Sequence, residues 1–165
     1  MSNQPENKGR DLTIFQLCDV VRETSFALHR YLRHGHAEKV YQNGLLHRLI
    51  KQGFRAESEI PLQVRDEDGT ILGDFYADLF VDGRLLIELK AVKALTDEHV
   101  AQILGYMRAS GCEHALLINF GSGRLEIRKY ILNEAFRAEG GSTGGKLSSL
   151  LSLFAPFCAT FFRNS

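Results

Sequence analysis

The chain has 165 residues, of which 44% are hydrophobic and 24% charged, enough for one domain with a sizeable core. Twenty basic residues balance twenty acidic ones, which excludes a globally basic nucleic-acid binder although not a local basic patch. Three widely separated cysteines with no CxxC pair argue against a disulfide framework and against a zinc site. With a polar N-terminus that lacks a secretory apolar region, they predict a cytoplasmic protein.

The first third of the chain is predicted to form two helices. Residues 1–10 are polar and are expected to be disordered, and apolar residues then recur with a near-helical period over 11–32. Gly35 is the expected left-handed stop of this first helix. A second helix is expected over about 37–52, with Gly53 as its stop. Glu38 falls in its first turn, where the helix dipole favours a carboxylate.

After Gly53 the pattern changes to that of strands. Three strands are predicted over 55–64, 71–81 and 85–92, separated by a turn at 66–69 and by the hairpin signal Asp82-Gly83. Thr96 is a plausible N-cap for a helix over 97–110 that stops at Gly111. The apolar run 115–120 predicts a strand covered on both faces, and 125–132 a last strand. The expected order is α-α-β-β-β-α-β-β.

The last part of the chain, 133–165, differs in composition from the predicted domain at 11–132. It begins with a Gly/Ser-rich linker and continues with an apolar stretch over 147–162. That stretch is 16 residues long and contains Pro156, so it falls short of a membrane-spanning helix. We expect the tail to contact the domain, a second copy of the chain or a protein partner, and no membrane.

Two carboxylates lie inside strongly apolar predicted strands. Asp78 stands between Ala77 and Leu79, and Glu88 between Ile87 and Leu89. A carboxylate in such surroundings loses hydration and needs a partner, either a lysine or a cation. Lys90 supplies one candidate, because strand alternation places it on the same side as Glu88.

If Asp78 and Glu88 converge, they form an oxygen-rich site suited to magnesium or manganese, to which the backbone carbonyl of Leu89 could add a ligand. Such a cation lowers the pKa of bound water and neutralises charge on a phosphodiester, and Lys90 could orient that water. A two-residue Asp82-Gly83 turn would pair Asp78 with Ile87 and turn Glu88 away. Convergence therefore predicts an odd-length loop or a β-bulge between the two acids.

Gln102 and Tyr106 are four residues apart and so share one face of the predicted helix. That face could be aimed at the strands, although spacing alone favours an ordinary half-buried tyrosine and a surface glutamine. The two leading helices are rich in basic residues that could contact phosphates. The candidates are Arg30, Arg33, Lys39, Arg48 and Lys51.

These residues carry a family resemblance over roughly 12–132. Asp78, the triplet Glu88-Leu-Lys90 and the pattern Gln102-Ile-Leu-Gly-Tyr106 resemble the PD-(D/E)xK nuclease superfamily, including the QxxxY helix of its RecB-like branch. Gly35-His-Ala-Glu38-Lys-Val-Tyr41 resembles the signature of the GxxExxY family within that superfamily. The stretches 73–78, 86–92 and 116–121 are also similar to that family.

The resemblance implies a restriction-endonuclease-like α/β core, with a central mixed sheet flanked by helices. It also implies that Asp78 and Glu88 bind magnesium, that Lys90 assists the attacking water and that Glu38 contributes a further acid from its helix. Gln102 and Tyr106 would steady the site or the scissile phosphate. Family members tend to have Gly-Pro-Gly before the helix acid, where this chain has Arg33-His-Gly-His36, which predicts a differently set loop.

The leading interpretation is a metal-dependent nuclease acting on nucleic acid, in the first place DNA. The alternative is a binding or scaffold protein that keeps the nuclease fold without turnover, which zero net charge and the lack of a DNA-reading module favour. A serine or cysteine hydrolase is disfavoured because there is no GxSxG motif and no cysteine in a motif beside a histidine. No HExxH spacing is present to indicate a zinc hydrolase.

Overall fold

A computed structural model describes residues 11–132. The expectations for 1–10 and 133–165 lie outside these residues. The described part contains helices α1 (Ile14–Leu32), α2 (Glu38–Lys51) and α3 (Asp97–Ser110) and strands β1 (Ala56–Arg65), β2 (Ile71–Val81), β3 (Leu85–Lys90), β4 (His114–Asn119) and β5 (Glu126–Ile131). Within 11–132, no helix is long and apolar enough to cross a membrane.

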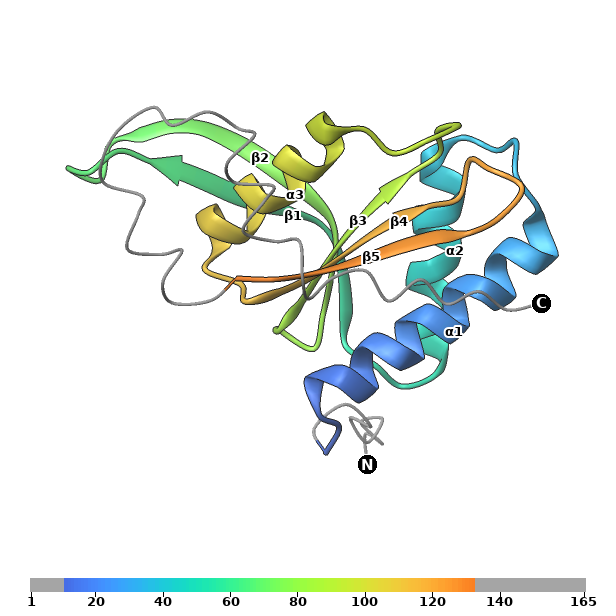
Figure 1. The fold of residues 1–165 in the computed structure, drawn as a ribbon. Coiled ribbons are helices and arrows are strands. Elements are labelled where there is room, and N and C mark those ends of the chain that lie inside the picture. The colour runs from blue at the N-terminus through green and yellow to red at the C-terminus, as the bar shows by residue number, and fades with distance from the viewer. Residues whose placement is uncertain (1–10, 133–165) are drawn as a thin grey trace.

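The strands form one mixed sheet in the order β1-β2-β3-β4-β5 (Figure 1). Strands β3 and β4 are parallel, joined through α3, and the other neighbouring pairs are antiparallel. Helices α1 and α2 cover one face of the sheet and α3 lies on the other (Figure 1). The predicted fold class and element order are therefore confirmed.

Helix boundaries follow local capping with small departures from expectation. Helix α1 begins after Thr13, whose side chain caps the first turn in a box with Gln16, rather than at Asp11. It ends at Leu32, because Arg33 already has a φ of 61° and Gly35, the expected stop, follows at 110°. The predicted cap at Thr96 is present: its backbone N–H donates to Nδ1 of His99, and its hydroxyl closes the capping box.

The sheet separates two hydrophobic cores. The first packs α1 and α2 against one face and includes Leu79, Ile87, Leu89 and Ile118. The second packs α3 against the other face and is made by a different set of residues, among them Ala77, Leu86, Leu117, Ile103, Tyr106 and Met107. Strand β3 is buried along its whole length, as expected of a central strand covered on both sides.

Strands β1 and β2 form a long curved ribbon (Figure 1). Residues two apart on a regular strand share a face, yet Leu79 packs in the α1/α2 core and Ala77 in the α3 core. Asp78 lies between them. Opposite it in β1, Glu59 has a φ of 55°, a conformation that non-glycine residues rarely adopt. The ribbon therefore changes the core to which it contributes at Asp78.

Candidate active site

The loop between β2 and β3 sets the register that the two buried carboxylates need. Val81 pairs with Leu85 and Leu79 with Ile87, so three residues, Asp82 to Arg84, form the loop. Asp82 and Gly83 both have positive φ, at 51° and 70°. The predicted odd-length loop is confirmed. Continuing this register places Asp78 opposite Glu88, on the same face of the sheet.

Glu88 and Lys90 form a buried ion pair on the α3 face. Their side chains lie 2.7 Å apart (Oε1 to Nζ), and the residues are only 3% and 9% exposed. Burial, together with the charge of Asp78, raises the pKa of Glu88 to about 7 in spite of Lys90. Burial works against the lysine charge, but the surrounding carboxylates outweigh it and raise the pKa of Lys90. The neighbouring carboxylates therefore favour the charged form of Lys90 and disfavour the charged form of Glu88.

Glu38 and Asp78 complete a group of three carboxylates around one ammonium. Oδ2 of Asp78 accepts the backbone N–H of Leu89 at 2.7 Å, and Oε1 of Glu38 lies 4.0 Å from Nζ of Lys90. Burial is the main cause that raises the pKa of both carboxyls, and each also feels Lys90 in the opposite direction. One lysine cannot balance three ionised acids, so this site favours an additional positive charge.

The start of α2 is shaped by the residues of the sequence signature. Gly35, with a φ of 110°, turns the chain between the two helices, and Glu38 is the first residue of α2. The Tyr41 hydroxyl donates to the carbonyl of Arg33 at 2.7 Å and accepts the backbone N–H of His36 at 3.2 Å. The Tyr41 ring is fully buried and stacks on Phe120. The tyrosine thus anchors the loop that delivers Glu38.

Helix α3 packs on the face of the sheet that carries Glu88 and Lys90. The Gln102 side-chain amide donates to the Tyr106 hydroxyl at 2.8 Å. Burial raises the pKa of Tyr106, and the charges of Glu88, Lys90 and Asp78 all act on it. The structure therefore brings Gln102 and Tyr106 to the same place as the three acids and the lysine.

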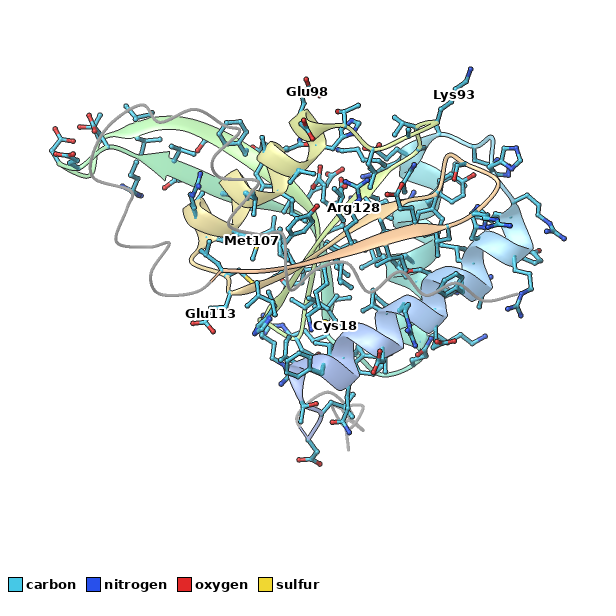
Figure 2. All side chains as sticks on the ribbon, viewed as in Figure 1. Cys18, Lys93, Glu98, Met107, Glu113 and Arg128 are labelled. Carbon is cyan, nitrogen blue, oxygen red and sulfur yellow. The ribbon has the colours of Figure 1, made fainter. Side chains whose placement is uncertain are left out.

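The basic candidates are spread along the two leading helices. Lys39 is close to the carboxylate group, since its charge acts on Asp78, but its ammonium is paired with Glu59. Arg48 and Lys51 lie about 14 and 18 Å beyond Lys39 along α2, at ~1.5 Å per residue, and Arg48 lies over the ring of Tyr31. Arg30 and Arg33 lie at the end of α1 that leads into the Gly35 loop. Lys93, in the loop between β3 and α3, and Glu98, in the first turn of α3, project outward (Figure 2).

Two buried polar side chains beside the site are absent from the sequence-based candidates. Gln42, 4% exposed, donates from its side-chain amide to the carbonyl of Asp78 at 2.9 Å. Asn119, fully buried, ends β4 directly beside Lys90. Gln42 carried a signal, because it stands three and seven residues before Leu45 and Leu49 on the buried side of α2. A polar residue on such a stripe needs a specific partner.

The carboxylates of the site offer part of the ligand set of a divalent cation. Within the described residues 11–132, no group of three or more His, Cys, Asp or Glu side chains is arranged to hold a metal ion. Oε2 of Glu88 is nevertheless buried and accepts no hydrogen bond from any residue of this part of the chain. Magnesium in proteins is commonly held by one or two carboxylates and several waters, so Asp78 and Glu88 alone meet its usual requirement.

Comparison with known proteins places the chain in a family. Residues 15–130 match the model of the PD-(D/E)XK nuclease superfamily. The structure described as SSO0001 is 15% identical, with a TM-score of 0.49 over 75% of this chain and 81% of that one. An alkaline exonuclease from Laribacter hongkongensis is 13% identical, with a TM-score of 0.39 over 74% and 72%. No curated protein matches the chain significantly. Since the family model spans most of the chain, this protein belongs to the PD-(D/E)XK nuclease superfamily.

Proposed function

We propose that the protein is a magnesium-dependent nuclease that hydrolyses phosphodiester bonds, with DNA as the first substrate to test. Membership of the nuclease superfamily supports the reaction class. One observation carries the assignment of the site: Asp78, Glu88 and Glu38 gather around Lys90 with more acidic than basic groups, and among residues 11–132 one oxygen of Glu88 has no hydrogen-bond partner.

In this proposal Asp78 and Glu88 hold the cation, with the Leu89 carbonyl as a further oxygen ligand. Glu38 lies close enough to Lys90 to take part, either on the cation directly or through a water. The bound cation would acidify a water molecule and neutralise charge on the phosphate. The residues of the chain then have separate tasks. The Asp78 carboxylate is already fixed by the Leu89 N–H, so it is oriented before any ligand arrives.

Lys90 is suited to place its ammonium beside both the attacking water and the phosphate. Its pKa is raised by the surrounding carboxylates, so it carries its charge at neutral pH and acts as a hydrogen-bond donor. Gln102 and Tyr106 would close the site from above and steady the scissile phosphate. Lys39 would exchange its pairing with Glu59 for a substrate phosphate, and the other four basic residues would contact the nucleic acid further away.

The test is cleavage of single- and double-stranded DNA and RNA by the purified protein with magnesium or manganese. Asp78→Ala and Lys90→Ala should each abolish cleavage, whereas Lys93→Ala, a matched lysine that projects outward, should retain it. Cleavage that survives both site substitutions would come from a contaminant. If no nucleic acid is cleaved and calorimetry finds no magnesium binding, the chain is a scaffold with a nuclease fold.

A further inference from the structure

Among the described residues, the end of β3 at Lys90 pairs through its backbone with β4 and no longer with β2. Regular pairing of β2 with β3 ends at Leu79 and Ile87, before Glu88 is reached. On the other side, β4 continues in parallel register as far as Lys90, which lies opposite Asn119. Beyond Ile87, the strand pairing that supports the site residues of β3 therefore comes from β4, while the Asp78 carboxylate holds the Leu89 N–H.

The backbone of Lys90 and of the two residues after it contacts three consecutive residues at the end of β4: Asn119, Phe120 and Gly121. The Phe120 N–H donates to the carbonyl of Lys90 at 2.7 Å. Oδ1 of Asn119 accepts the Val92 N–H at 3.1 Å and the Gly121 N–H at 3.0 Å. One side-chain oxygen thus joins the ends of both strands.

Gly121 is needed for the closeness of this contact. A Cβ at Gly121 would lie 2.2 Å from the backbone nitrogen of Val92 and 2.3 Å from the carbonyl carbon of Ala91. Backbone atoms at that distance have to move, so any side chain here displaces the end of β3. Gly123, two residues later, has no atom within 4 Å of the same position.

The amide end of Asn119 has no corresponding structural task. Its Nδ2 is buried and donates to no residue of the described chain. Because both bonded groups are N–H donors, the atom that they meet has to be the oxygen, which fixes the orientation of the side chain. Replacement by aspartate would therefore keep both acceptor contacts and lose no hydrogen bond to another described residue.

We propose that Asn119 is a positioning residue of the active site, acting with Gly121 to hold the end of β3 so that Lys90 and Glu88 keep their places. This inference rests on the proposed nuclease function for its kinetic consequence. It assigns to β4 a part in a site whose other members come from α2, β2, β3 and α3.

The kinetic test compares Asn119→Ala, Asn119→Asp and Gly121→Ala with the matched control Gly123→Ala in the cleavage assay. Loss of the acceptor should lower kcat by about 10- to 100-fold, because small displacements of catalytic groups have large effects on rate, with KM changed by less than about threefold. Asn119→Asp should recover part of the loss and Gly123→Ala should behave as the unaltered protein. Full kcat in Asn119→Ala, or an aspartate variant no better than the alanine variant, would overturn the proposal.

A second measurement does not require activity. Hydrogen exchange of the backbone amides of residues 89–92 should be faster in Asn119→Ala than in the unaltered protein, with the Val92 amide affected most, and unchanged in Gly123→Ala. Equal exchange rates would refute the positioning role. If the unaltered protein cleaves nothing but exchange changes as expected, the nuclease function fails while the structural role of Asn119 stands.

Discussion

The carboxylate of Asp78 accepts the backbone N–H of Leu89 at 2.7 Å, where Asp78 lies one residue and Leu89 two residues beyond the last regular pair of β2 and β3. The Asp78 side chain thus accepts a backbone N–H that lies beyond the regular pairing of β2 with β3. Because Leu89 stands between Glu88 and Lys90 in the sequence, the contact holds the Asp78 carboxylate close to both of them. It also makes Asp78 both a structural and a chemical member of the site, so its substitutions need controls for stability.

Glu88→Gln should change how stability depends on pH. Glu88 binds its proton more tightly in the folded chain, where its pKa is about 7, than in the unfolded chain, where it is near 4.5. Its contribution to stability is therefore fully present below about pH 4.5 and is lost as pH rises through 7. Between pH 5 and 8 the unaltered protein should lose on the order of 2 to 3 kcal/mol relative to Glu88→Gln.

Denaturant unfolding at several pH values measures this difference. Glu67→Gln, a substitution at an exposed turn residue, serves as the control and should run parallel to the unaltered protein. Parallel curves for Glu88→Gln as well would mean that the carboxyl is not protonated in the neutral range.

Magnesium should stabilise the folded chain through Asp78 and Glu88. A ligand at 100 times its Kd adds about 2.7 kcal/mol to the free energy of unfolding. For a chain of this length that corresponds to a rise in Tm of roughly 5 to 10 °C. Thermal unfolding with increasing magnesium should show the rise in the unaltered protein and none in the double variant Asp78→Asn with Glu88→Gln. A rise of the same size in both would assign magnesium binding elsewhere on the chain.

Tyr41→Phe should release the loop before α2. The change removes the hydroxyl contacts to the Arg33 carbonyl and the His36 N–H while keeping the ring that stacks on Phe120. Loss of these contacts should cost about 1 to 2 kcal/mol of stability and reduce cleavage, because Glu38 is delivered by this loop. Tyr31→Phe, at a tyrosine that is 77% exposed, should change neither stability nor rate. Unfolding and cleavage assays on both variants measure the two effects, and a Tyr41→Phe variant that matches Tyr31→Phe in both would contradict the prediction.

Gln42→Leu should loosen the backbone of Asp78, because it removes a hydrogen bond to the Asp78 carbonyl. The side chain keeps a similar size, but the donor to the Asp78 carbonyl is lost in a buried position. We expect a stability loss of about 1 kcal/mol and a several-fold lower kcat, since the backbone of Asp78 is then held less firmly. Asn43→Ala, at the adjacent exposed position, is the control. Equal kcat in Gln42→Leu and Asn43→Ala would show that the contact of Gln42 with Asp78 does not affect the rate of cleavage.

Much of the fold could be predicted because local signals and burial agree. The three-residue loop followed from requiring that Asp78 and Glu88 share a face, although the sequence alone shows only an Asp-Gly turn signal. The expected end of the first helix at residue 32 is confirmed, and Gly35 was expected as its stop because glycine readily adopts positive φ, whereas positive φ already begins at Arg33. Its carbonyl is then held by Tyr41, a tertiary contact that no local pattern reveals.

The site was predictable where residue types are chemically unusual for their surroundings. Asp78, Glu88 and Lys90 interrupt apolar strands, and such positions demand partners. Asn119 gave no comparable sign, because an asparagine at a strand end is an ordinary turn residue. Its importance depends on the parallel pairing of β3 with β4, which joins residues 29 positions apart in sequence. Likewise, the pairing of Lys39 with Glu59 depends on how α2 meets the ribbon.

Strand β2 contributes to one core before Asp78 and to the other after it, which has a consequence for how this protein can change over evolution. Leu79 and Ala77 pack in the cores on opposite faces of the sheet, and Asp78 is the residue that separates them. A volume change in either layer is therefore transmitted along one strand to the same carboxylate. Mutational drift in the interior is constrained from both directions here, and compensating pairs of substitutions should bridge the two layers through β2.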